Sequence, residues 1–240
     1  MIPKRIFYAW YGSATLPFEA KRNIEKWREL NPNYEIIELN ETNTDVSDNS
    51  FVRDAYLEGR WGFVPDFPRL AAIYEYGGFY MDVDVELLKP LDQLTNEKSV
   101  WGMENSGKVN AGTLFGAEKG NPDILNLMEI YRGLSFSTEE MQTIVSTDII
   151  SKYFATKGLR QINKTQLLDS GAKIYSVEYF APLHFWGGGK VTKNSIAVHY
   201  YDGSWVSGNK QKSLYSWLVR EWILWSPWTY YTVRAFFGKK

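Results

Sequence analysis

Residues 1–40 constrain the fold more than any other part of the chain. Residues 6–10 form an apolar run that predicts a buried strand, and Pro17 opens a helix whose apolar face carries Ile24, Trp27 and Leu30. Asn31-Pro32 stops this helix, and residues 34–39 predict a second strand. A strand, a helix and a strand in this order predict parallel pairing with a right-handed crossover, and therefore an α/β sheet.

Three further helices and one late strand are predicted downstream. The helices cover residues 51–58, 66–76 and 138–154. We expect Asp66 to cap the second helix and Gly77-Gly78 to end it, while Ser137 and Glu140 fit a capping box before the third. The stretch AVHYYDGSW, residues 197–205, predicts a strand that ends in a turn.

Composition excludes several classes of function. The 240 residues are 44% hydrophobic, which is enough for a substantial core without disulfides or structural metals. The chain has no cysteine, so thiol catalysis and zinc clusters are excluded and a reducing cytoplasm is the expected compartment. The net charge is -1 and the 27 basic residues are scattered, which argues against nucleic acid as a partner. The N-terminal residues contain no apolar run of signal-peptide type.

The last 33 residues differ in composition from the rest, so we expect a catalytic domain at 1–207 and an aromatic and basic helical segment at 208–240. The charge-free run 222–233 contains Pro227 and is shorter than the roughly 20 residues that a membrane-spanning helix needs. Its tryptophans and tyrosines beside basic residues suit peripheral association with a membrane interface. A terminal helix that packs back on the domain explains the same pattern.

The stretch GGFYMDVDVE, residues 77–86, places acids where a strand is expected. In an extended strand Asp82, Asp84 and Glu86 share one face, and the apolar residues between them share the other. Acids are poor strand formers, and like charges on one face repel unless a positive group lies among them. A bound divalent cation would supply that charge, whereas a half-solvated strand with a polar outer face is the alternative.

The preceding helix brings further polar groups to the same place. A helix over 66–76 is about 16 Å long, and six extended residues cover about 20 Å. If the chain reverses at Gly77-Gly78, Asp66 and Arg69 come close to Asp82 and Asp84. Oxygen ligands without thiolates suit Mg²⁺ or Mn²⁺, and an imidazole would favour Mn²⁺. The chain has two histidines, His184 in an irregular stretch and His199 in the late strand.

Three stretches resemble, in this order, the DXD sugar-binding-region glycosyltransferases, glycosyltransferase family 32. They are IPKRIFYAWYG (2–12), FVPDFPRLAAIYEYGGFYMDVDVELLKPLD (63–92) and VTKNSIAVHYYDGSW (191–205). That family includes initiating mannosyltransferases, capsular and exopolysaccharide transferases and, more distantly, glucosylating toxins. The combination of D-x-x-R, G-G-x-Y, D-x-D and a late His with Ser-Trp carries the resemblance.

The resemblance implies an α/β fold of GT-A type, a single Rossmann-like nucleotide-sugar-binding domain with a mixed, mainly parallel sheet flanked by helices. It also implies a nucleotide-diphosphate sugar donor, with a UDP-sugar favoured, a divalent metal, Mn²⁺ or Mg²⁺, and retention of anomeric configuration. Asp82, Asp84 and His199 match the metal site, and Asp82 also matches the residue at the donor ribose. Asp84 and Arg69 are the expected catalytic residues.

The remaining matched positions are expected to bind the donor. Trp10 matches the aromatic residue that stacks on the nucleobase, and Trp205 matches the tryptophan of the closing Ser-Trp. Asp66 and Arg69 match the pair that holds the hydroxyls of the donor sugar. Asn110, in VNAGTLFG, is expected to face the donor or acceptor sugar.

The expected activity is that of a metal-dependent hexosyltransferase in surface polysaccharide synthesis, with a glycan or lipid-linked acceptor at the inner face of the membrane. Pro65 and Pro68 depart from the family, which usually has a small residue such as Ser before the aspartate and a residue other than proline before the arginine. Proline is tolerated in a first helical turn, but loss of the Ser hydroxyl would weaken donor binding.

Two other functions fit parts of the sequence. A D-x-D after an apolar strand also occurs in haloacid-dehalogenase-type phosphohydrolases, although their acids lie near the N-terminus and a Thr or Val usually stands at the position of Glu86. A non-catalytic carbohydrate-binding domain would use the many aromatic residues, which make up 16% of the chain, but it would not need a metal cluster.

Overall fold

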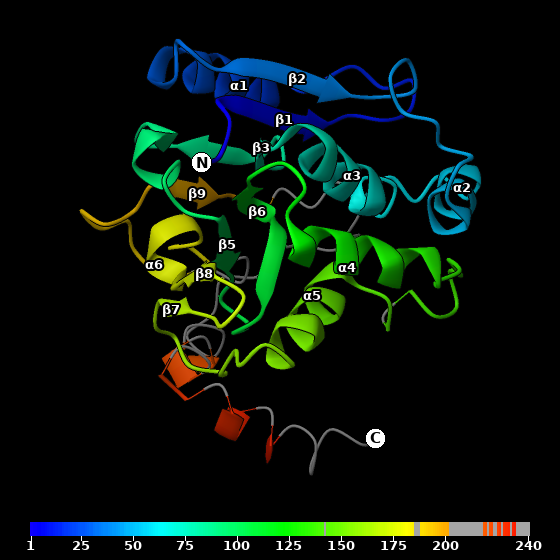
Figure 1. Ribbon diagram of the computed structural model, residues 1–240. Coiled ribbons are helices and arrows are strands. Elements are labelled where there is room, and N and C mark those ends of the chain that lie inside the picture. The colour runs from blue at the N-terminus through cyan, green and yellow to red at the C-terminus, as the bar shows by residue number, and fades with distance from the viewer. Residues whose placement is uncertain are drawn as a thin grey trace.

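The computed structural model describes residues 1–141, 143–184 and 188–201, and in the tail residues 218–219, 221–222, 225–226, 228–230 and 232–233. Figure 1 shows how its helices and strands are arranged. They are β1 (Arg5–Ala9), α1 (Phe18–Leu30), β2 (Glu35–Leu39), α2 (Ser50–Leu57), α3 (Asp66–Tyr76), β3 (Gly78–Tyr80), β4 (Val85–Leu87), the 3₁₀ helix η1 (Leu91–Leu94), β5 (Ser99–Met103), β6 (Val109–Ala117), α4 (Pro122–Arg132), α5 (Ser146–Ala155), β7 (Gln166–Leu167), β8 (Ala172–Tyr175), α6 (Val177–Phe180) and β9 (Ala197–His199).

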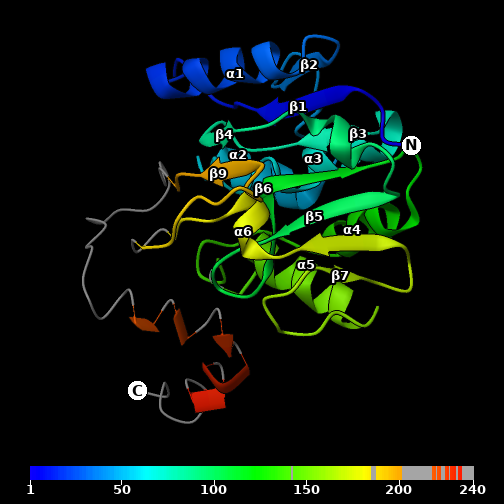
Figure 2. The same ribbon diagram turned by 90° about the vertical axis from the view of Figure 1, so that its left-hand side faces the viewer.

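A seven-stranded sheet with the order β2-β1-β3-β6-β5-β8-β7 organises the molecule (Figure 2). Strand β1 pairs in parallel with both β2 and β3, whereas β6 runs antiparallel between β3 and β5. A second sheet contains β4 and β9, which pair in antiparallel orientation. The predicted α/β class with a mixed, mainly parallel sheet is confirmed.

Apolar side chains cover both faces of the large sheet. Phe7 and Phe115 belong to a buried cluster that includes residues of α2, α3, α4 and α5. Ile6 and Leu114, one position earlier on the same strands, belong to a second cluster with residues of α1, α6, β4 and β9. Since neighbouring strand residues point to opposite faces, the two clusters form the two sides of a three-layer fold, visible in Figure 1.

The predicted strand–helix–strand unit at the N-terminus is confirmed. Strands β1 and β2 are parallel, with Arg5 opposite Glu35, and α1 ends where Asn31 closes its last turn. The helices predicted at 51–58 and 66–76 also correspond to α2 and α3. Gly77 and Gly78 follow α3 with φ of 64° and 125°, backbone that favours glycine, so the chain reverses there as predicted.

Two predictions about helix starts are wrong. The helix predicted from residue 138 begins at Ser146, because turns occupy the stretch after Ser137, where the amide of Glu140 bonds to the Ser137 carbonyl. The Ser137 hydroxyl accepts from the amide of Glu139, so the capping box does not form. Asp66 does not cap α3 either. It is the first helical residue, after Pro65, and its carboxylate binds Arg69 instead.

The predicted extended strand through the acids is also wrong. Strand β3 ends at Tyr80, and the amide of Val85 bonds to the Asp82 carbonyl at 3.0 Å, which closes a turn between β3 and β4. Asp82 and Asp84 therefore lie in this turn. Glu86 lies beyond it in β4, where Lys26 and Tyr200 bind its carboxylate. Glu86 does not share the site of the two aspartates.

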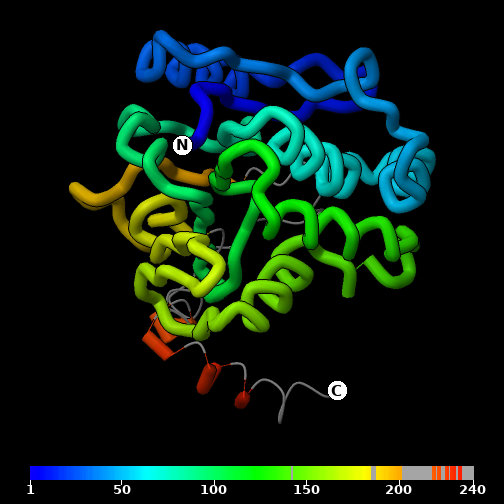
Figure 3. Tube along the Cα trace, in the orientation of Figure 1, coloured from blue at the N-terminus to red at the C-terminus, as the bar shows by residue number. Residues whose placement is uncertain are grey.

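Helix α1 holds the turn that carries these aspartates. The amide of the Asn23 side chain donates to the Val83 carbonyl at 2.9 Å, and Trp27 Nε1 donates to the Val85 carbonyl at 2.9 Å. Asn23 and Trp27 are 3% and 0% exposed, so little water competes for these carbonyls. Figure 3 shows how the chain after β3 turns back toward β9, whose pairing with β4 completes the support of this turn.

The predicted domain boundary between residues 207 and 208 lies outside the described residues. In the described part of the tail, Leu218, Trp222, Trp225 and Trp228 are exposed. Glu221 and Trp225 line a cavity of about 600 Å³ together with α6 and residues 162–164. None of the helices described in the structure combines the length and apolar character that crossing a bilayer requires.

Replacing Trp27 with Phe is expected to lower the free energy of unfolding by about 1–3 kcal/mol, because the buried Val85 carbonyl loses its donor and the core loses volume. Denaturant unfolding followed by circular dichroism measures this change. Phe18, on the same helix, is 75% exposed, and Phe18→Leu should change stability by less than about 0.5 kcal/mol. Equal effects of the two substitutions would contradict the anchoring role of Trp27.

Candidate metal centre

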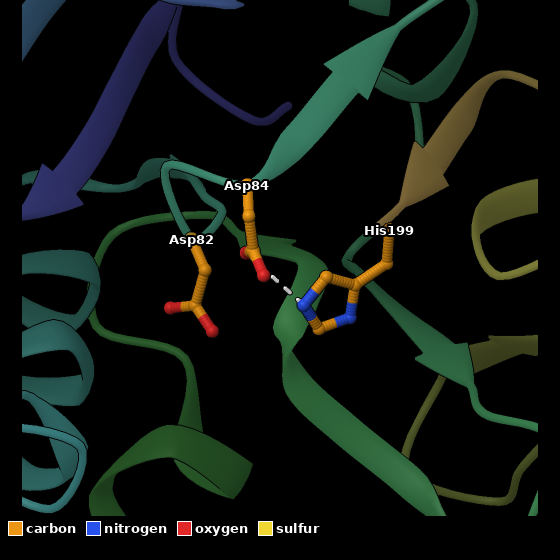
Figure 4. A group of neighbouring side chains, drawn as sticks. All are labelled: Asp82, Asp84 and His199. Atoms are coloured by element: carbon orange, nitrogen blue, oxygen red, sulfur yellow. Dashed lines mark ion pairs between the residues drawn. The ribbon is translucent and has the colours of Figure 1, made fainter. Parts of the chain in front are cut away.

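Asp82, Asp84 and His199 form a cluster at the end of β3. Each offers one ligand atom, and these atoms lie within 4.8 Å of one another. His199 Nε2 lies 3.1 Å from an Asp84 carboxylate oxygen. In Figure 4 both aspartates extend from the turn between β3 and β4, and the His199 ring reaches Asp84 from β9. The structure thus brings together the three residues that the sequence predicted as metal ligands.

His199 is held in place from three sides. In the pairing of β4 with β9 its backbone lies opposite Val85, one residue after Asp84. Its Nδ1 lies 3.3 Å from the Thr113 hydroxyl of β6, and the Tyr201 ring stacks on it with centroids 4.0 Å apart. Tyr201 has φ of 53°, a conformation that is costly for a residue with a side chain. This backbone strain therefore occurs beside the cluster, where Tyr201 contacts His199.

Asp82 is positioned by β3, α3 and β6 together. The Tyr80 hydroxyl donates to its carboxylate at 3.0 Å, and an Arg69 nitrogen lies 4.0 Å from the same oxygen. Its backbone amide donates to the Gly112 carbonyl of β6 at 2.8 Å. A Cβ at Gly112 would overlap the Asp82 carboxylate, so the carboxylate occupies the space that a side chain on β6 would fill.

The predicted approach of α3 to the acids is confirmed for Arg69 and Asp82. Arg69 and Asp66 form an ion pair, and both are buried, with 4% and 2% exposure. Burial raises the pKa of Asp66 to about 6, although the charge of Arg69 lowers it. Pro65 and Pro68 lie at the start of α3, where a missing amide hydrogen breaks no helical bond, and the helix forms despite them.

Burial and neighbouring charges shift the pKa values of Asp82 and His199. Burial raises the pKa of Asp82; Arg69 lowers it, and the neighbouring Asp84 raises it again. Burial lowers the pKa of His199, but the carboxylates of Asp84, Asp82 and Glu104 together outweigh it, so the pKa of His199 lies above its usual value. In both cases a neighbouring carboxylate raises the pKa, and a bound cation would lower it.

This donor set fits a divalent cation. Carboxylate oxygens with one imidazole nitrogen suit Mg²⁺ or Mn²⁺. Ligand atoms at neighbouring positions of an octahedral Mg²⁺ site are about 3 Å apart, which matches the separation of 3.1 Å between Asp84 and His199. His184, the other histidine, is buried and does not belong to the cluster.

Of the remaining predicted residues, the structure describes Asn110 and Trp10. Asn110 lies beside the cluster, since its Oδ1 accepts from the Gly112 amide at 2.6 Å and its amide group donates to Glu104 at 2.9 Å. Trp10 follows β1, with its Nε1 bound to the Ala14 carbonyl at 2.6 Å. Trp205 lies outside the described residues.

Sequence reasoning missed three residues of the site, Tyr80, Gly112 and Thr113. Tyr80 belongs to the G-G-x-Y motif, so its position two residues before Asp82 was a usable signal. Gly112 and Thr113 act across strands, from β6 toward β3 and β9. Their contacts depend on strand order, which the spacing of residues along the chain does not reveal.

Gly112→Ala is expected to displace the Asp82 carboxylate and to lower the free energy of unfolding by about 1–3 kcal/mol, as overpacking does. Most of this loss should disappear in an Asp82→Ala background, because the overlapping carboxylate is then absent. Denaturant unfolding of the wild type, both single variants and the double variant measures this coupling.

Gly116→Ala is the matched control on the same strand. Its added Cβ would overlap the Phe79 ring and the Gly78 carbonyl. The loss of stability from Gly116→Ala should therefore be the same with and without Asp82. If the loss from Gly112→Ala were also independent of Asp82, the steric role of Gly112 would be wrong.

Comparisons with known proteins bear on this site. Residues 17–101 match the family model described as "Glycosyltransferase sugar-binding region containing DXD motif". The matched part runs from the residue before α1 into β5 and includes Asp66, Arg69, Asp82 and Asp84. A search among curated proteins gave no match.

Solved structures with a similar fold include the PaToxG glycosyltransferase, with a TM-score of 0.54 and 14% identity over 65% of this chain and 68% of that one. The apo form of the glycosyltransferase GlyE of Streptococcus pneumoniae has a TM-score of 0.51 and 11% identity. That alignment covers 98% of this chain and 64% of the GlyE chain. Residues 17–101 therefore match a DXD glycosyltransferase region, and the chain has a fold of GT-A type.

Proposed function

We propose that this protein is a metal-dependent, retaining hexosyltransferase of glycosyltransferase family 32 type that uses a nucleotide-diphosphate sugar. The observation that carries the proposal is the convergence of Asp82, Asp84 and His199 within 4.8 Å, with both aspartates inside the matched DXD glycosyltransferase region. Parallel strands β1 and β3 end at this edge of the sheet, where α/β proteins commonly bind nucleotides.

The three clustered side chains would hold Mn²⁺ or Mg²⁺, with Asp84 as the most direct ligand. A bound divalent cation stabilises the negative charge that develops on a departing diphosphate. Asp82 is proposed to contact the ribose as well. Tyr80 and Arg69 keep its carboxylate oriented for both tasks.

The donor sugar is assigned to Asp66, Arg69 and Asn110. The buried ion pair of Asp66 with Arg69 lies next to Asp82, and Asn110 approaches from the other side through Gly112. The side chain of Asn110 is fixed by Glu104 and the Gly112 amide, so it could present its remaining amide hydrogen to a sugar hydroxyl without reordering. Trp10 is proposed to stack on the nucleobase and Trp205 to contact the donor.

Retention of configuration is proposed by a front-face route. The bond between the anomeric carbon and the phosphate oxygen breaks, the acceptor oxygen attacks from the same side, and the leaving phosphate takes the acceptor proton. Arg69, a fixed cation beside Asp82, would contribute to stabilising charge in this step. This route needs no carboxylate nucleophile from the protein.

The acceptor is proposed to be a glycan or a lipid-linked sugar in surface polysaccharide synthesis, with a UDP-sugar as donor and the cytoplasmic face of the membrane as the location. Exposed Trp222, Trp225 and Trp228 support peripheral membrane association of residues 208–240 beside a catalytic domain at 1–207. Glu221 and Trp225, which line a cavity with α6, support the alternative that this segment packs on the domain.

Asp84→Ala is expected to abolish metal-dependent donor turnover, by at least about 100-fold, while the fold persists. Turnover is measured as release of nucleoside diphosphate with Mn²⁺, and the fold by circular dichroism. Glu86→Gln is the matched control, since Glu86 is two residues away but binds Lys26 and Tyr200. An Asp84→Ala variant that stayed active without metal would contradict the proposal.

Hydrolysis of UDP-Gal, UDP-Glc, UDP-GlcNAc and GDP-Man with Mn²⁺ should identify one preferred donor, and simple phosphoesters should release no phosphate. Phosphate release from those esters would favour the phosphohydrolase alternative. Calorimetry distinguishes the glycosyltransferase from a non-catalytic carbohydrate-binding domain, because such a domain would bind glycan without metal and would not bind UDP. The glycosyltransferase should bind UDP more tightly with Mn²⁺ than without it.

A further inference from the structure

We propose that Trp61 forms an aromatic wall against which the nucleobase of the donor stacks, held ready by Gly12, Glu41 and Tyr56. The inference rests on the proposed function and extends the nucleotide subsite beyond Trp10. Trp61 lies in the stretch between α2 and α3. No residue of that stretch before Asp66 was predicted as a site residue.

The Trp61 ring is fixed by contacts at the exit of β1. Gly12 has φ of 86°, and a Cβ there would lie only 3.2 Å from the six-membered ring of Trp61. The ring therefore lies close against the backbone of Gly12. The Tyr56 ring packs edge-on against the Trp61 ring, with centroids 5.3 Å apart and an interplanar angle of 82°.

Glu41 connects these contacts into one unit. Its carboxylate accepts from the Gly12 amide at 2.7 Å and from the Tyr56 hydroxyl at 3.1 Å. The loop after β1, the loop after β2 and the end of α2 are thereby joined around Trp61. Glu41 acts here as a positioning residue, because it binds the two groups that contact the indole.

Trp61 keeps much of its surface open despite these contacts, with 45% exposure. Core tryptophans such as Trp27 and Trp101 are 0% exposed. A half-exposed ring held by its neighbours offers a stacking surface that loses little conformational entropy when a ligand binds. Every nucleobase has a π-face that can stack on such a ring.

Gly12, against which Trp61 packs, and Asp82 of the metal centre follow two neighbouring parallel strands. Phe7 of β1 lies opposite Tyr80 of β3. Gly12 is five residues beyond Phe7 and Asp82 is two beyond Tyr80, so both follow the carboxyl ends of a parallel pair, which meet at the same edge of the sheet. A nucleotide whose diphosphate lies at Asp82 and Asp84 can therefore extend its base along this edge, toward Trp61.

The test compares ligands with and without a base. Binding of UDP, GDP and inorganic diphosphate, each with Mn²⁺, is measured by calorimetry for the wild type and Trp61→Ala. Trp61→Ala should weaken binding of the tighter nucleotide about 5- to 150-fold, the range for loss of one base–aromatic stack, and leave the affinity for inorganic diphosphate unchanged. Trp61→Phe should bind the nucleotide with an affinity between those of the wild type and Trp61→Ala.

Leu57→Ala is the matched control, because Leu57 is 76% exposed at the end of the adjacent helix α2. It should bind every ligand as the wild type does. Unchanged nucleotide affinity in Trp61→Ala, or equal weakening of nucleotide and inorganic diphosphate, would overturn the role of Trp61 while leaving the proposed function standing. A wild type that binds neither nucleotide with Mn²⁺ would overturn the proposed function and this inference with it.

Discussion

Electrostatic repulsion between Asp82 and Asp84 is the constraint on which the rest of the site depends. The two carboxylates sit in a short turn after β3, in a region where burial already raises the pKa of Asp82. Arg69 of α3 brings positive charge to the carboxylate of Asp82, and the imidazole of His199 in β9 lies against the carboxylate of Asp84. These partners lie on elements far apart in sequence, so the fold itself is what brings compensating charge to the turn.

The sheet explains how such a turn can be held in one conformation. Antiparallel β6 passes beside the end of β3, and Gly112 leaves room there for a carboxylate instead of a side chain. Helix α1 binds the turn from the opposite face through Asn23 and Trp27. A cluster supported on both faces keeps its ligand atoms near one another before any cation arrives, which reduces the reorganisation that binding requires.

Local sequence signals predicted much of the fold and part of the site. Apolar periodicity and the Asn31-Pro32 and Gly77-Gly78 breaks correctly bounded the first helices, because those signals act within a few residues. Asp82 and Asp84 were predicted to lie together on one face of an extended strand, and they do lie together, but in a turn. The backbone of Asp82 bonds to Gly112 and Val85 and turns the chain where the alternation of acids predicted a strand. Helix α4, with Asn121 bonding to two amides of its first turn, was overlooked. Contacts across strands, such as Thr113 with His199, needed the strand order.

The most direct measurement is anomalous diffraction at the manganese absorption edge from crystals grown with Mn²⁺ and a nucleoside diphosphate. We expect one strong peak within coordination distance of the carboxylates of Asp82 and Asp84 and of the His199 imidazole, with the diphosphate bound at the same ion. A peak bound elsewhere on the protein, or an ordered nucleotide with no ion at these three side chains, would contradict this expectation.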